Sequence, residues 1–105
     1  MYELRQYRIK KGKMKEWVKL MENEILPFQV SKGMVIAASF TAPEDPTLYV
    51  WLRRFTTEAQ KKRLYDKVYG SDHWKNVISP KIGKLLDRSS IVVTKLVPTT
   101  ASVLQ

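Results

Sequence analysis

The sequence contains no cysteine and only one histidine, His73, among its 105 residues. The absence of cysteine excludes disulfides, thiolate metal ligands and cysteine nucleophiles, and it fits a reducing compartment. One histidine supplies too few ligands for a transition-metal site, so we expect no metal and no cofactor. His73 is a weak candidate for a catalytic base, because a lone histidine beside Asp72 and Trp74 at a helix start more often lies on the surface.

Glycine-rich motifs and long apolar runs are also missing. The four glycines form no GxGxxG, P-loop or GxSxG pattern, so nucleotide-binding and serine-hydrolase motifs have no support. The opening MYELRQYRIKKGK lacks the apolar core of a signal peptide, and no later run is long enough to cross a bilayer. We therefore expect a cytoplasmic protein without a membrane span.

Acidic residues are scarce: 10 Asp and Glu stand against 19 Lys and Arg, for a formal net charge of +9. Such an excess of positive charge is typical of proteins that bind nucleic acid or anionic membranes. However, the basic residues are spread along segments with helical periodicity, mostly opposite the apolar stripe, where solvated lysines are common. We therefore do not expect nucleic acid to be a partner.

The pattern along the chain predicts four strands and three helical segments. Residues 2–10, 34–41, 47–55 and 90–97 have strand character, and the turn chemistry of residues 42–46 joins the second and third strands as a hairpin. A long amphipathic helix runs from Lys13, with a kink at Pro27 and a C-cap at Gly33. A second helix is predicted at 57–70, with Thr57 and Gln60 in capping-box spacing. A third helix is predicted after Asp72, which can act as its N-cap.

The strand TLYVWLRRF, residues 47–55, has two contrasting faces. One carries the aliphatic side chains of Leu48, Val50 and Leu52, and the other carries Tyr49, Trp51 and Arg53. We expect the aliphatic face to meet the core and the aromatic face to lie on the uncovered side of the sheet, where it binds a ligand or a second subunit. The faces of the first strand cannot be assigned from its pattern.

The order β, α, β, β, α, β predicts an α+β fold of the ferredoxin-like type, βαββαβ, with an antiparallel four-stranded sheet and its helices on one face. The chain length fits one domain, residues 1–98, followed by a short tail at 99–105. A sheet with one naked face either binds something there or dimerises face to face.

The sequences of several segments resemble those of the NIPSNAP family. The opening YELR strand with its KxGK turn, the helix carrying ILPF, the junction RRFTTEAQKKR, the SDHWKNV helix start and the last strand closed by a proline all resemble family features. The resemblance implies a dimeric α+β barrel, in which two ferredoxin-like subunits join their sheet faces. Family members often place a His and a Trp in the third strand, where this chain has Trp51 and Arg53.

Five side chains are the candidates for a ligand site. Arginine forks can fix an anionic or carbonyl-bearing ligand, and tyrosine and tryptophan can line an apolar pocket with polar tips. These residues are Arg5, Tyr7, Tyr49, Trp51 and Arg53. An inter-subunit salt bridge, with Glu3 as the partner of the arginines, explains the two charges equally well.

Three functions remain open on the sequence. The first is a homodimeric protein that binds a small organic molecule, as a cofactor-independent oxygenase or isomerase in which arginine stabilises an enolate-like anion. The second is a non-catalytic dimeric binding or adaptor protein that uses the same surfaces. The third is an RNA-recognition module, which shares the element order but needs a glycine-containing strand pattern that LYVWLRRF lacks.

Overall fold

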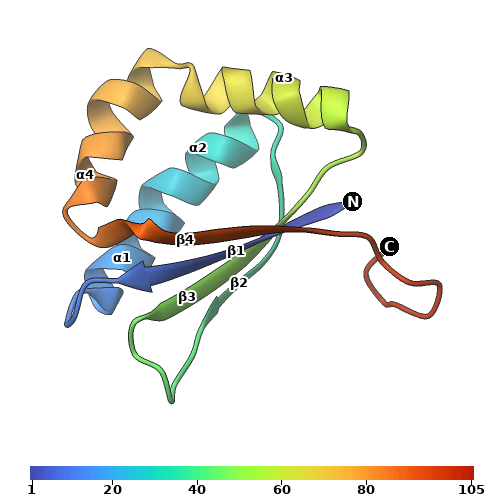
Figure 1. Ribbon diagram of the computed structural model, residues 1–105. Coiled ribbons are helices and arrows are strands. Elements are labelled where there is room, and N and C mark those ends of the chain that lie inside the picture. The colour runs from blue at the N-terminus through green and yellow to red at the C-terminus, as the bar shows by residue number, and fades with distance from the viewer.

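The computed structural model describes residues 1–105 and confirms the predicted α+β, ferredoxin-like fold. The four strands form one antiparallel sheet in the order β2-β3-β1-β4. Their bounds are Tyr2–Ile9 for β1, Val35–Thr41 for β2, Leu48–Arg54 for β3 and Leu86–Leu96 for β4. The turn that joins β2 and β3 projects from one end of the sheet (Figure 1).

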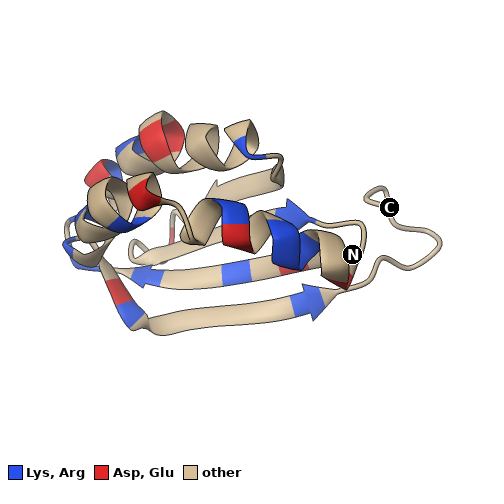
Figure 2. Cartoon of the chain, turned by 90° about the horizontal axis from the view of Figure 1, so that it is seen from above, with Lys and Arg blue, Asp and Glu red and all other residues tan.

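All helical segments form one layer over one face of the sheet (Figure 2). The first long helix consists of α1 (Met14–Leu20), η1 (Met21–Ile25) and α2 (Leu26–Ser31). The second is α3 (Glu58–Tyr69), and the third comprises η2 (Trp74–Ile78) and α4 (Ser79–Gly83). Basic residues are distributed over helices and strands alike, with acidic residues among them (Figure 2).

Two of the helices contain a π-helical turn just before a proline. In η1 the amide of Leu26 donates to the carbonyl of Met21, five residues back, and Pro27 follows. In a regular α-helix the ring of Pro27 would clash with the carbonyl four residues earlier, and a π turn is one way to relieve this. The predicted distortion at Pro27 is thus confirmed, as is the C-cap at Gly33, whose φ is 106°.

The helix starts agree with the sequence in one case and differ in another. Thr57 caps α3 as predicted, because its hydroxyl accepts from the amide of Gln60 at 3.0 Å. The third helix is capped by Ser71 rather than by Asp72, since the Ser71 hydroxyl accepts from the amide of Trp74 at 3.2 Å. The last strand begins at Leu86, four residues before the predicted start.

The predicted faces of β3 are reversed in the structure. Tyr49, Trp51 and Arg53 lie under the helices and are 1%, 2% and 0% exposed, whereas the aliphatic side chains at positions 48, 50 and 52 are half-buried on the open face. The prediction that the aromatic face is uncovered is therefore wrong. The helices that cover this side contribute aromatic residues of their own, such as Trp17, and large aromatics pack against one another across the layer.

The open face of the sheet is apolar. Val35 and Phe40 of β2 and Val92 and Leu96 of β4 are between 40% and 58% exposed on their strands. Residues 99–105 contain no helix or strand, and the tail turns beyond the end of β4 (Figure 1), where the Tyr2 hydroxyl donates to the carbonyl of Gln105 at 2.8 Å. None of the helices has the length and apolar character needed to span a bilayer.

Candidate functional site

The register of β1 and β3 assembles a polar and aromatic cluster beneath the helices. Glu3 is paired with Arg53, Arg5 with Trp51, and Tyr7 with Tyr49. Paired residues of neighbouring strands point to the same side of a sheet, so these six side chains form two columns on the covered face. The structure thus brings all five predicted ligand residues together and settles the faces of β1, which the sequence left open.

Arg53 is the centre of this cluster. Its side chain is 0% exposed, and its Nη2 donates to Glu3 Oε1 at 2.5 Å and to the Tyr65 hydroxyl at 3.0 Å. Its Nη1 donates to the Tyr69 hydroxyl at 2.7 Å and to Gln29 Oε1 at 3.0 Å. A buried guanidinium is tolerated only when its donors are satisfied, and here only Nε lacks a partner.

Glu3 neutralises much of the buried positive charge. Its carboxylate accepts from Arg53, from Arg5 Nη1 at 3.1 Å and from the Tyr65 hydroxyl, and Lys61 Nζ lies 3.3 Å away. Burial by itself would raise the pKa of Glu3, but the charge of Arg53 and the hydrogen bonds from Tyr65 and the arginines outweigh it and lower the pKa to about 2. The salt bridge of Glu3 with the arginines therefore forms within one chain, whereas the predicted alternative was a bridge between subunits.

Arg5 connects the ion pairs to the aromatic part of the cluster. Its Nε donates to the Tyr7 hydroxyl at 2.8 Å and its Nη1 to the Tyr65 hydroxyl at 3.2 Å, while its Nη2 makes no hydrogen bond. The guanidinium carbon lies 6.0 Å from the ring centre of Trp51. One edge of the Arg5 fork is therefore free to hold a ligand.

A cavity of about 150 Å³ lies against this cluster, between the sheet and the helices. Arg5, Tyr7 and Trp51 line it from the sheet, whereas Tyr49 and Arg53 lie outside its lining. Residues from the helices and from β4 complete the wall: Trp17, Met21, Ile25, Gln29, Tyr69, Trp74, Ile82, Leu86, Arg88 and Ile91. All three tryptophans of the chain therefore border one small, mostly apolar space.

The two strand tyrosines of this cluster, Tyr7 and Tyr49, differ in their partners. Burial raises the pKa of Tyr7, against the charge of Arg5, and burial raises that of Tyr49 to about 12, against its hydrogen bond with the Ser39 hydroxyl. Both phenols therefore stay protonated at neutral pH. The ring of Tyr7 packs edge-on against Trp17 and Trp51, with ring centres 5.8 and 6.2 Å apart, which fixes its hydroxyl beside Arg5.

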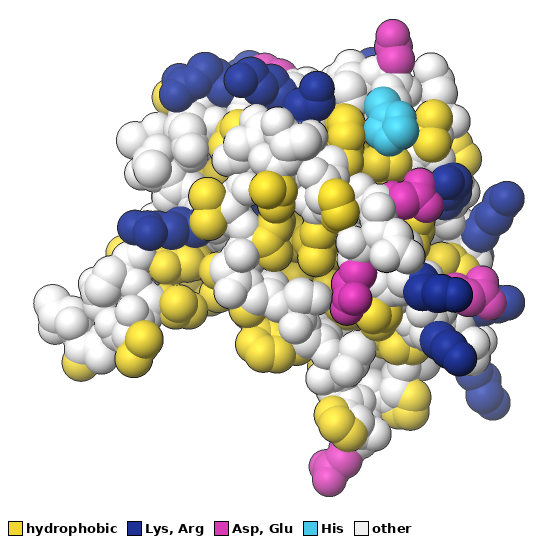
Figure 3. Space-filling model, turned by 180° about the vertical axis from the view of Figure 1, so that it is seen from behind, with side chains coloured by type: hydrophobic (Ala, Val, Ile, Leu, Met, Phe, Trp, Pro, Cys, Tyr) yellow, Lys and Arg dark blue, Asp and Glu magenta, His cyan; other side chains and the backbone are white.

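His73 does not belong to this cluster. It is exposed on the surface (Figure 3). Its ring centre lies 4.9 Å from that of Phe28, and it does not line the cavity. In contrast, sequence reasoning missed Gln29, Tyr65 and Tyr69 as partners of the arginines. Tyr65 and Tyr69 are four residues apart on α3, so their shared helix face could have indicated a pair of hydroxyls directed at the sheet.

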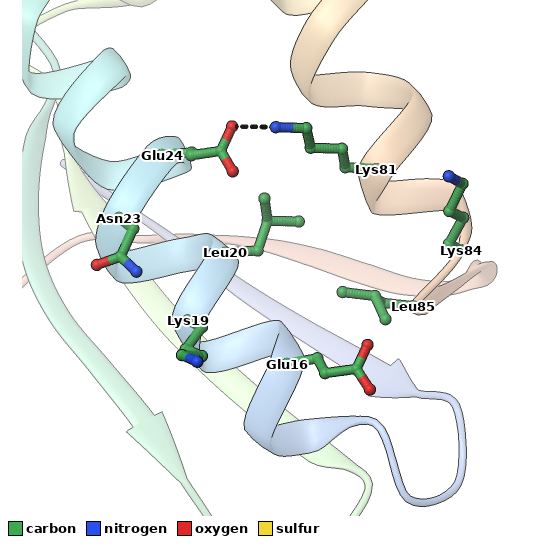
Figure 4. A pocket seen from close by; sticks show the side chains of 8 residues that line it. All are labelled: Glu16, Lys19, Leu20, Asn23, Glu24, Lys81, Lys84 and Leu85. Atoms are coloured by element: carbon green, nitrogen blue, oxygen red, sulfur yellow. Dashed lines mark hydrogen bonds and ion pairs between the residues drawn. The ribbon is translucent and has the colours of Figure 1, made fainter.

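A second hollow, of about 330 Å³, lies between the first and third helices (Figure 4). An ion pair between Lys81 Nζ and Glu24 Oε1, 2.7 Å apart, crosses it. Although larger, this groove is open to solvent and is lined mainly by charged side chains, and it contains none of the predicted site residues. The smaller cavity has the apolar wall and few convergent polar groups of a ligand site.

The comparisons with known proteins agree with this architecture. The NIPSNAP family model matches residues 2–101. The chain belongs to the NIPSNAP family. None of the curated proteins compared with the chain matches it.

Three solved structures show how widely this NIPSNAP fold is shared. A NIPSNAP family protein from Agrobacterium tumefaciens is 24% identical with a TM-score of 0.87, over 99% of this chain and 97% of that one. An uncharacterized NIPSNAP domain protein from Burkholderia xenovorans is 20% identical with a TM-score of 0.84, over 96% of each chain. A protein from Bacteroides thetaiotaomicron named for antibiotic biosynthesis monooxygenases is 15% identical with a TM-score of 0.67, over 93% and 88%. At these identities the likeness establishes the fold alone.

Proposed function

We propose that this NIPSNAP protein is a homodimer that binds a small organic molecule in the cavity between its sheet and its helices. The observation that carries the proposal is a buried network of Glu3, Arg5 and Arg53 beside an unfilled space. Protein interiors are close-packed, and burying charge is costly, so a hollow next to fixed charges is unusual for a purely structural core. Such an arrangement is typical of a site prepared for a ligand.

The open face of the sheet supports the homodimer. Its exposed valines and Phe40 form an apolar surface that a second copy of the same sheet would cover, giving the dimeric α+β barrel that the family resemblance implies. The predicted ligand residues then lie behind the dimer interface rather than in it. The ligand cavity and the dimer interface are consequently two separate surfaces of the sheet.

The chemistry that these residues could supply is electrostatic. Glu3 is held by three donors and has a pKa of about 2, so it is a poor proton acceptor. Arg5, with its free Nη2, is placed to stabilise an enolate-like anion, as an oxygenase or isomerase acting on a carbonyl compound requires. The name of the Bacteroides structure supports this class by fold analogy only.

A non-catalytic binding or adaptor protein is the second candidate. The exposed side chains of Val97 (73%) and Val103 (99%) extend the apolar surface into the tail and favour protein contacts at this end of the sheet. In this function the cavity would bind a ligand without converting it, or would stay empty. The adaptor function is therefore distinguished by ligand binding and turnover, not by the oligomeric state.

The homodimer is tested by sedimentation equilibrium. We expect the protein to have twice the 12.3 kDa mass of one chain, and Val50→Lys, which places a charge on the open face, to shift it toward the single-chain mass. Lys62→Glu on the exposed surface of α3 is the control and should remain dimeric. A wild-type protein of 12.3 kDa across micromolar concentrations would contradict the dimer.

Ligand binding is tested through the three tryptophans, since all of them line the cavity. We expect some member of a panel of small carbonyl and aromatic compounds, neutral and charged, to change their emission saturably. Mass spectrometry of the bound compound after incubation in air then separates an enzyme from a carrier. If no compound in the panel changes the emission, the cavity is not a ligand site.

A further inference from the structure

The side chains around the cavity have unused hydrogen-bond donors, whereas their carboxylate and amide oxygens are already engaged. From this imbalance we infer that the cavity selects a compact organic anion, specifically a carboxylate attached to a small planar apolar group. The inference rests on the proposed function, that the cavity binds a small molecule, and adds the chemical class of that molecule.

Several donors at the wall have no acceptor. Nη2 of Arg5 makes no hydrogen bond. The hydroxyls of Tyr7 and Tyr69 accept from Arg5 and Arg53, but neither donates its own proton to a protein group. All three side chains line the cavity, so these donors are suited to an acceptor supplied by a ligand.

The acceptors next to the cavity are already engaged. Both oxygens of Glu3 accept hydrogen bonds, Oε1 from the two arginines and Oε2 from Tyr65. Oε1 of Gln29, the amide that lines the cavity, accepts from Arg53. A ligand that brings only donors, such as an ammonium or amidinium group, would find no unpaired carboxylate or amide oxygen here.

The charge around the cavity has the same sign as this donor excess. The guanidinium groups of Arg53, which is fully buried, and of Arg5, which is 14% exposed, face one carboxylate, that of Glu3, and Lys61 Nζ lies 3.3 Å from the same carboxylate. The two guanidinium charges therefore exceed the charge of Glu3 by one. A monovalent anion would balance this excess, and Nη2 of Arg5 with the Tyr7 hydroxyl can donate to the two oxygens of a carboxylate.

The volume and the lining residues of the cavity define the apolar part of the ligand. A cavity of 150 Å³ is close to the volume that holds one benzene molecule. Trp17, Trp51 and Trp74, with Ile25 and Ile82, supply flat and aliphatic walls around it. A single ring, or a planar unsaturated chain of similar size, fits this space with its carboxylate toward Arg5.

The test compares three probes of nearly equal shape: benzoate, benzamide and benzamidinium. Binding is measured by isothermal titration calorimetry at pH 7, with tryptophan emission as a second readout. We expect benzoate to bind roughly 10-fold or more tightly than benzamide, because a hydrogen bond to a charged group is stronger than one to a neutral group, and benzamidinium not to bind. The comparison uses the wild-type protein and so does not depend on any variant folding.

Variants then test which side chains of the cavity wall bind the carboxylate of benzoate. Arg5→Gln should weaken benzoate binding roughly 10- to 100-fold and leave benzamide binding nearly unchanged. Tyr7→Phe keeps an aromatic wall, removes one hydroxyl, and should weaken benzoate binding by a smaller factor. Arg8→Gln is the matched control, because Arg8 is on the same strand but faces outward, where it pairs with Asp45.

The outcomes separate this inference from the proposed function. Equal or tighter binding of benzamide or benzamidinium would overturn the anion class while leaving a ligand-binding cavity. An equal loss of benzoate binding in Arg5→Gln and Arg8→Gln would overturn the placement at Arg5. Failure of all three probes, together with the wider panel, would overturn the ligand cavity itself and the anion class with it.

Discussion

Replacing Glu3 with glutamine should destabilise the protein in a pH-dependent way. The substitution preserves the shape of the side chain but leaves the guanidinium groups of Arg5 and Arg53 buried without their counterion. The pKa of Glu3 is about 2, against an ordinary value of 4.5. At roughly 1.4 kcal/mol for each pKa unit, the ionised form contributes about 3 kcal/mol to the free energy of unfolding. Breaking a buried ion pair typically costs about 3–5 kcal/mol, which is consistent.

The sign of the pH dependence follows from the lowered pKa of Glu3. The unfolded carboxyl takes up its proton near pH 4.5, whereas the folded one resists protonation until the pH approaches about 2. The contribution of Glu3 is therefore fully present above pH 4.5 and is lost as the pH falls toward 2. The gap in stability between wild type and Glu3→Gln should be widest at neutral pH and should narrow over this acidic window.

The assay is urea unfolding followed by circular dichroism from pH 7 to pH 2.5, at one fixed protomer concentration because an oligomer's stability depends on concentration. At pH 7 the variant should lose about 3 kcal/mol, or roughly 10–20 °C in Tm for a domain of this size. Glu58→Gln, which removes the exposed pair with Lys95, is the control and should change little. A Glu3→Gln loss that is negligible, or that is the same at pH 3 and pH 7, would refute the assignment.

Two further substitutions test the local structure. Gly33→Ala should cost roughly 1–3 kcal/mol in chemical denaturation, because φ is 106° and the added methyl would meet Leu64 Cδ2 at 3.1 Å; Gly12→Ala, with φ of 77° and no neighbour within 4 Å, should cost less. Thr57→Ala removes the cap of α3 and should lower stability by about 1 kcal/mol, whereas Thr56→Ala, next to it, should have a smaller effect because only the backbone amide of Thr56 bonds to Gln60.

The fold could be predicted from the sequence because its signals are local. Helical periodicity, the turn at residues 42–46, the cap at Thr57 and the glycine at position 33 each depend on neighbouring residues, and all four agree with the structure. The start of β4 was missed because Leu85 and Leu86 continue the apolar spacing of the preceding helix. Both side chains are buried in either interpretation, so their pattern alone could not distinguish helix from strand.

The position of the site could not be predicted because both faces of β3 carry large apolar side chains. On β3 the aliphatic face and the aromatic face are both apolar enough for burial, so alternation identified two faces without showing which one the helices cover. The pairing of Glu3 with Arg53 indicates which face the helices cover. However, this pairing depends on strand register, which is set by tertiary contacts. Gln29, from a helix, and Tyr69, from another, reach the same guanidinium, and no sequence spacing relates these positions.

The π turn at Met21–Ile25 also sets which residues of the first helix face the sheet. A π turn holds one residue more than an α turn, so it absorbs that residue and keeps the segments before and after it in phase. Deleting one residue inside the turn would restore a continuous α-helix and leave Gln29 facing Arg53. Deleting one residue between the turn and Gln29 would instead rotate Gln29 by about 100° around the helix axis, and Arg53 would lose an acceptor without any change in its own strand. The effect of a change in the length of the first helix therefore depends on where the change falls, which no substitution scan of the sheet would reveal.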